Sequence, residues 1–167
     1  MKDPEQQGIS LGAAASVVAV IAVLVVVSLP RLQAFALGEN EADAAALTRV
    51  LGRELAEEGS PSLSLASLVE EAGLDPKHDD LEWLDGGRLL RRHGYLFELT
   101  ANKAGAALCA WPWTYGDTGR AAFVFRRDRG MLRHGNPSGA WTGPARPPAG
   151  LEPGWVVVAE EPDPPAF

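Results

Sequence analysis

An uncharged run of 21 residues near the amino terminus, residues 9–29, constrains this chain more than any other feature. It reads ISLGAAASVVAVIAVLVVVSL and consists mostly of Val, Ala, Leu and Ile. As an α-helix it would span about 31 Å, which matches the hydrocarbon core of a bilayer. Lipid offers the backbone no hydrogen-bond partners, and a helix satisfies its own polar groups internally. We therefore predict a membrane-spanning helix over residues 9–30.

The flanks of this run argue against a cleaved secretory signal. A polar leader, residues 1–8, precedes it and ends in Gly8, and Pro30 and Arg31 follow it directly. A secretory signal has an apolar core of about 7–15 residues and then a cleavage site of small residues. This run is longer and no such site follows, so we expect a retained helix.

The order of polar leader, glycine, small-residue-rich apolar helix and proline resembles bacterial type IV pilins and the pseudopilins of type II secretion. In that family the leader is cleaved after the glycine, and a proline is the twenty-second residue of the mature chain. Counted from Ile9, Pro30 is the twenty-second residue. The resemblance implies cleavage between Gly8 and Ile9 by a prepilin peptidase, methylation of the new amine, and a filament subunit in the bacterial inner membrane.

The apolar run departs from the family at its fifth position. Family members carry a glutamate there that pairs with a neighbouring subunit's amine, whereas this chain has Ala13. A charge inside a membrane is costly unless it is paired, so the alanine removes that pairing. Together with the acidic leader, Ala13 favours a minor or tip subunit. Gly12, Ala13 and Ser16 offer the small surface that close helix packing between subunits uses.

An amphipathic helix pattern continues over residues 31–58. Apolar residues recur there at three- and four-residue spacing, which lines one helix face: Ala44, Leu47, Leu51 and Leu55. Pro30 removes one backbone hydrogen bond and is expected to kink the helix rather than end it. We favour one continuous helix. The alternative is a membrane helix, a break, and a separate domain helix.

Residues 59–134 are expected to form a small α+β domain. A short helix would begin after Ser62 or Ser64, and glycine-containing turns separate four strand-like segments, residues 94–100, 106–113, 120–126 and 131–134. We predict an antiparallel sheet of three or four strands packed against the apolar face of the amphipathic helix. Residues 135–167 are rich in Pro and Gly, with one candidate strand at 155–159.

Charge and motifs point away from catalysis and from nucleic acid. The formal net charge is −7, whereas nucleic-acid binding favours a basic surface. The single cysteine, Cys109, lies in an apolar run and is expected to be a buried hydrophobic residue. His78, Asp79 and Asp80 lack the spaced ligands of a calcium loop, so a solvated loop is favoured over a metal site. No nucleophile, cofactor or metal motif was found, and we predict that the chain is not an enzyme.

Two basic groups could together bind a phosphate-rich partner such as DNA or lipid headgroups. One group consists of Arg88, Arg91 and Arg92, and the other of Arg120, Arg126, Arg127, Arg129 and Arg133. A solvated sheet face that balances the acidic helices is the favoured interpretation.

The sequence thus predicts a pilin-like or pseudopilin-like structural subunit whose partners are the lipid bilayer and, through the N-terminal helix, other subunits. The alternative is a permanently anchored envelope protein whose exported domain binds a ligand or partner. Lys2 and Arg31 balance each other across the apolar run, so placement of the domain outside the cytoplasm follows from the resemblance.

Overall fold

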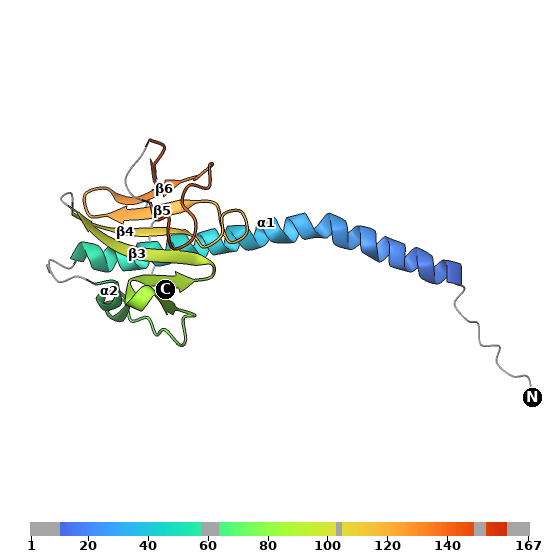
Figure 1. The fold of residues 1–167 in the computed structure, drawn as a ribbon, viewed down its shortest axis with the longest axis horizontal. Coiled ribbons are helices and arrows are strands. Elements are labelled where there is room, and N and C mark those ends of the chain that lie inside the picture. Colours follow the sequence, from blue (N-terminus) through green and yellow to red (C-terminus); the bar gives the residue numbers. More distant parts are fainter. Residues whose placement is uncertain (1–10, 58–63, 103–104, 149–152, 160–167) are drawn as a thin grey trace, which may run out of the picture. The chain divides into compact units, whose positions relative to one another are not determined.

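The computed structural model describes residues 11–57, 64–102, 105–148 and 153–159. The chain divides into two compact units, Met1–Phe35 and Ala36–Phe167. The first helix, α1 (Leu11–Glu57), contributes residues to both units (Figure 1). Pro30 lies inside α1, and the helix continues through it. The prediction of one continuous helix is therefore confirmed for the described residues.

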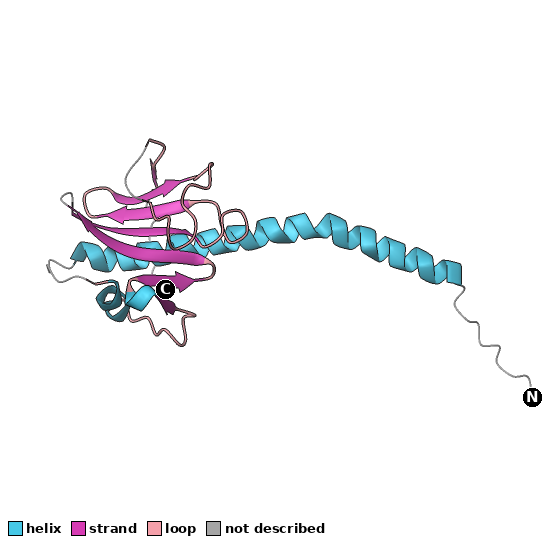
Figure 2. Cartoon of the chain, viewed as in Figure 1, coloured by secondary structure: helices cyan, strands magenta, loops and turns pink. Residues whose placement is uncertain are grey.

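The second unit contains a seven-stranded sheet in which every strand pairs antiparallel with the next one in the chain (Figure 2). The strands are β1 (Glu82–Leu84), β2 (Leu89–Arg92), β3 (Tyr95–Asn102), β4 (Gly105–Pro112), β5 (Ala122–Arg126), β6 (Gly130–His134) and β7 (Val156–Val157). The predicted α+β class is confirmed, but the expected three or four strands were too few.

The strands that the sequence analysis missed lie at the start of the sheet. A 3-10 turn, η1 (Asp85–Gly87), joins β1 to β2. Both strands are short, and in β2 the consecutive residues Leu89 and Leu90 are both fully buried, in the cores on opposite faces of the sheet. A strand buried on both faces shows no alternation of apolar and polar residues, so the pattern used to find strands was absent.

The first core lies between the sheet and α1. The predicted apolar face of the helix is buried there, with Leu51 and Leu55 fully inaccessible to solvent, and it packs with residues such as Phe97 and Phe123. A short second helix, α2 (Leu65–Glu71), adds Leu65, Leu68 and Val69 to the same core. In Figure 1 the end of α1 passes along the face of β3 and β4.

The helix α2 starts where capping chemistry predicts. The hydroxyl of Ser64 accepts a hydrogen bond from the Ser67 backbone N–H at 3.1 Å, and the Ser67 hydroxyl accepts one from the Ser64 N–H at 3.1 Å. This reciprocal arrangement satisfies two donors that a helix start would otherwise leave open. Ser64 is therefore the capping residue of the two serines considered from the sequence.

The second core covers the opposite face of the sheet, which the sequence analysis did not expect to be buried. The large members of this core are Trp111 from β4 and Trp141 from the Pro- and Gly-rich segment. Asn136 is 1% exposed; its amide donates to the Trp141 carbonyl at 2.9 Å and accepts from the Trp141 N–H at 3.2 Å. The segment over residues 135–148 thus forms no strand, and its Trp141 packs on the second face of the sheet.

Candidate functional site

The N-terminal part of α1 exposes large apolar side chains from Val17 to Leu29, and Leu32 and Phe35 follow beyond Pro30 and Arg31. Among the described residues there is one helix long and apolar enough to cross a membrane, and it lies in α1. Its large side chains are exposed, for example Val20 at 59%, Leu24 at 60% and Phe35 at 67%. A contiguous apolar surface of this kind marks contact with a membrane or with another protein.

The residues expected to mediate helix packing lie at the start of α1. A Cβ added at Gly12 would have no heavy atom within 4 Å, so a neighbouring helix can approach closely there. The hydroxyl of Ser16 donates to the Gly12 carbonyl at 2.9 Å, which satisfies this polar group without water. Gly8 and Ile9 lie outside the described residues, as does the side chain of Ala13.

Polar side chains of α1, at the start of the second unit, form hydrogen bonds with backbone groups of the loop before β5. The side-chain amide of Asn40 donates to the Thr118 carbonyl at 3.0 Å. The Oε1 atom of Glu41 accepts hydrogen bonds from the backbone N–H groups of Arg120, at 3.0 Å, and Ala121, at 3.2 Å. The Oε2 atom of Glu41 pairs with Arg133 of β6 at 3.2 Å.

A second carboxylate on the same stretch of α1 reaches the turn between β2 and β3. The two carboxylate oxygens of Asp43 lie 3.2 Å from a guanidinium nitrogen of Arg92 and 3.1 Å from Nδ1 of His93. His93 has φ of 43°, in the left-handed region that tight turns require. We name Asn40, Glu41 and Asp43 together the helix clamp.

Sequence reasoning missed the helix clamp because it considered only the apolar face of this helix. The backbone groups that Glu41 binds lie about 80 positions further along the chain, and the His93 side chain that Asp43 contacts lies 50 positions further. No local pattern reveals such pairings. The sequence does contain one sign of these contacts, because the polar residues Asn40, Glu41 and Asp43 lie close together just before the buried Ala44.

Five arginines of the candidate anion-binding surface lie on the β5–β6 hairpin and the loop before it: Arg120, Arg126, Arg127, Arg129 and Arg133. Arg133 is paired with Glu41 of the helix clamp. Arg120 donates to the same carboxylate through its backbone N–H. Both residues therefore take part in attaching the sheet to α1.

The other three arginines lie around the turn of that hairpin. Arg126 and Arg129 lie 2.9 Å and 3.7 Å from the carboxylate of Asp128, and the hydrogen bond from Arg126 lowers the pKa of this carboxyl group. The Nε atom of Arg127 donates to the Leu55 carbonyl at 2.7 Å, close to the end of α1. These contacts favour a structural role for the group over an open anion site.

The remaining candidate chemistry is explained by packing and turns. Cys109 is 3% exposed, and burial raises the pKa of its thiol to about 11, so the reactive thiolate is scarce at neutral pH. The carboxylate of Asp79 accepts from the Asp75 N–H at 2.8 Å and shapes the loop itself. Within the described ranges, no cluster of three His, Cys, Asp or Glu side chains could hold a metal ion.

Comparisons with protein-family models, curated proteins and solved structures found no match.

Proposed function

We propose that this chain is a pilin-like or pseudopilin-like structural subunit of a bacterial type IV pilus or type II secretion filament, in a minor or tip position. The observation that carries the proposal is α1 itself. Its N-terminal part exposes an apolar surface, while its C-terminal part is the helical side of an α+β core. A single helix that serves both purposes suits a subunit held in a membrane before assembly and packed against other subunits afterwards.

The chemistry of the first turns supports packing between subunits. The open surface at Gly12 and the internally bonded Ser16 allow close approach of another helix in lipid. Under the proposal the chain crosses the inner membrane once, its domain lies outside the cytoplasm, and a prepilin peptidase removes the leader after Gly8.

A second candidate function is a permanently anchored envelope protein whose exported domain binds a ligand or partner. The residue that favours it is Ala13, which stands where the family's pairing glutamate would be. This alternative keeps the membrane helix but requires neither processing nor assembly.

The N-terminal peptide mass of the full chain, purified from a bacterium that expresses a prepilin peptidase, separates the two candidates. We expect a chain that begins at Ile9 with a methylated amine, and we expect Gly8→Val to retain Met1. Gly12→Ala is the matched control, because its added Cβ meets no neighbour, and it should be processed normally. A wild-type chain that still begins at Met1 would contradict the filament proposal and favour the anchored protein.

A further inference from the structure

A cluster of three aromatic rings beside the second core is built around one histidine. The ring of His134, the last residue of β6, lies 4.7 Å from the ring of Trp141 and 5.3 Å from that of Trp155, measured between ring centroids. The two tryptophan rings stack on each other at 5.2 Å. We name His134, Trp141 and Trp155 the aromatic cluster. It joins β6 to two later parts of the chain, residues 135–148 and residues 153–159.

One ring nitrogen of His134 serves as a hydrogen-bond acceptor. The backbone N–H of Asn136 donates to Nδ1 of His134 at 2.8 Å. Nδ1 accepts only while it carries no proton, so this bond requires a neutral imidazole with its proton on Nε2. Asn136 is 1% exposed and has φ of 46°, an uncommon conformation for a residue other than glycine. A buried backbone in this conformation depends on the hydrogen bonds that hold it.

Asn136 also connects His134 to Trp141. Its side-chain amide donates to the Trp141 carbonyl at 2.9 Å and accepts from the Trp141 N–H at 3.2 Å. Trp141 in turn packs in the second core with Trp111 and Val124. The burial of this face of the sheet is therefore linked, through Asn136, to the protonation state of one ring.

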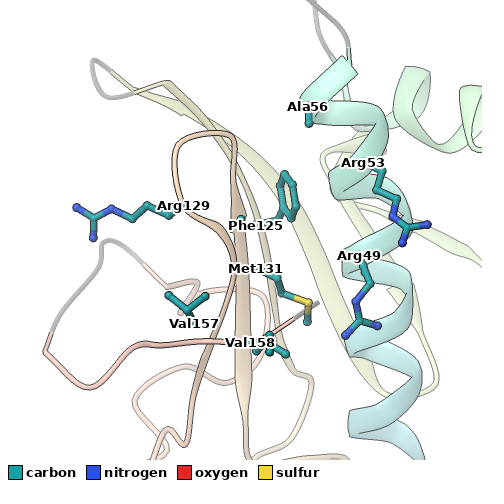
Figure 3. Close-up of a pocket in the computed structure, with 10 residues that line it drawn as sticks. Arg49, Arg53, Ala56, Phe125, Arg129, Met131, Val157 and Val158 are labelled. Atoms are coloured by element: carbon teal, nitrogen blue, oxygen red, sulfur yellow. The ribbon is translucent and has the colours of Figure 1, made fainter. Parts of the chain in front are cut away.

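The segment that carries Trp155 is attached to the sheet along β6. The backbone N–H of Val158 donates to the Met131 carbonyl at 2.9 Å, and Figure 3 shows the two side chains close to each other. A pocket of about 370 Å³ lies between these residues and Arg49 and Ala56 of α1 (Figure 3). The strand β7 has two residues, and both are about two-thirds exposed. The position of Trp155 therefore depends on β6 and on the aromatic cluster.

We propose that His134 makes the packing of the second core sensitive to acid, because protonation at Nδ1 releases Asn136 and, with it, Trp141 from the sheet. A proton on Nδ1 turns the acceptor into a donor that faces the N–H of Asn136. Hydrogen bonding to the neutral form of a group disfavours its charged form. The aromatic cluster is already short of acceptors, since among the described residues the buried Nε1 of Trp155 has no hydrogen-bond partner.

The charged residues around His134 do not favour its protonation. The ring packs against residues 135–148 and 153–159, and its strand pairs with β5 at Ala122. The described charged residues of these segments, β5 and β6 are all basic: Arg126, Arg133 and Arg146. Asp128 lies in the turn at the opposite end of β6, and Glu41 pairs with Arg133. An imidazolium would be attracted to the tryptophan rings, but this attraction supplies no acceptor for the N–H of Asn136.

The direction of the effect follows from proton binding. An imidazole in an unfolded chain titrates near pH 6.5, at about the middle of the range from pH 5 to 8. The open state of the second core binds a proton on His134 that the packed state excludes, so packing weakens as the pH falls. For one proton, the equilibrium constant for opening rises by at most about tenfold per pH unit. The inference does not depend on whether the chain joins a filament.

Cys109 reports on this opening, because it is the single cysteine of the chain and is 3% exposed in the second core. The experiment measures how fast a thiol reagent labels Cys109 in the full chain, in detergent, between pH 5 and pH 7.5. Each rate is divided by that of His134→Asn at the same pH, which cancels the ionisation of the thiol. Asparagine offers an oxygen to the N–H two residues on but binds no proton. We expect this ratio to rise about tenfold from pH 7.5 to pH 5.

Two control variants show whether His134 causes the response. His78→Asn removes a histidine whose side chain is 85% exposed in the loop before β1. Glu152→Gln removes the one acidic residue between positions 135 and 159, which lies outside the described residues. Both variants should keep the wild-type response to pH. A ratio of wild type to His134→Asn that does not change with pH, or a response that is lost in either control, would overturn the proposal.

Hydrogen exchange of the wild-type chain, followed by mass spectrometry, tests the proposal without a substitution. After correction for the intrinsic exchange rate at each pH, peptides from residues 135–148 should lose protection between pH 7.5 and pH 5. Peptides from the part of α1 that lies in the first core, residues 44–55, should keep theirs. Equal protection of residues 135–148 at both pH values, or a loss that α1 shares to the same extent, would contradict the proposal.

Discussion

Glu41 shows how a single carboxylate joins two distant parts of the domain. It is a helical residue with a side chain 20% exposed, and it accepts from two consecutive backbone N–H groups while it pairs with Arg133. Ala121, one of the two backbone donors, is 1% exposed, so water cannot easily replace the carboxylate. A charged acceptor in this position gives stronger hydrogen bonds than a neutral one.

We predict that Glu41→Ala lowers the free energy of unfolding of the domain by about 1–3 kcal/mol, because it leaves a buried N–H without its acceptor. Chemical denaturation of the full chain in detergent, followed by tryptophan fluorescence, measures this loss. Glu39→Ala is the matched control, since Glu39 is an exposed acidic residue two positions earlier. Equal stability of the two variants would show that Glu41 contributes nothing to the stability of the domain.

At the scale of elements, the contact between α1 and β5 depends on a glycine. A Cβ added at Gly52 would lie within 3 Å of three ring atoms of Phe125, so the helix and the strand approach too closely for any side chain. Glycine in a helix interior costs about 1 kcal/mol relative to alanine. Glycine is nevertheless required here, because the Phe125 ring occupies the space that the methyl group of an alanine would need.

We predict that Gly52→Ala destabilises the domain by about 1–3 kcal/mol, since overpacking outweighs the gain in helix propensity. The control is Gly38→Ala in the same helix, where an added Cβ meets nothing within 4 Å and stability should rise by up to about 1 kcal/mol. Thermal unfolding of both variants shows whether each substitution raises or lowers the stability of the domain. The packing argument fails if Gly52→Ala is also stabilising.

The elements that sequence reasoning recovered are those with a local signal. Period-two alternation identified β3, and glycine turns bounded β5 and β6. A serine at 62 or 64 was expected before α2, and the structure has Ser64 as its cap. The pairing of β1 with β2 and the packing of Trp141 on the sheet have no such local signal. Both depend on residues that come together only when the sheet has formed. Of the candidate sites, the apolar helix surface follows from composition alone, whereas the helix clamp and the aromatic cluster require the fold.

At the scale of the whole molecule, the two units differ in how much of their apolar surface is buried within the chain. The second unit buries its own apolar residues in two cores on either face of one sheet. The first unit leaves side chains such as Val17, Val20 and Leu24 more than half exposed. A substitution that adds charge should therefore have opposite consequences in the two units, even though α1 contributes residues to both.

We predict that Val20→Arg releases the chain from the membrane fraction, whereas Val50→Arg does not. At the centre of a membrane helix an arginine costs about 2.5–3.5 kcal/mol, which corresponds to a change of roughly 70- to 400-fold in an insertion equilibrium. Val50 is an equally apolar residue of α1, but it is 40% exposed on the surface of the second unit, where a guanidinium group remains in water. The measurement is the fraction of each full-length variant that resists extraction from membranes at alkaline pH. Retention of Val20→Arg at the wild-type level would contradict membrane insertion of this helix, and its apolar surface would then require a protein partner instead.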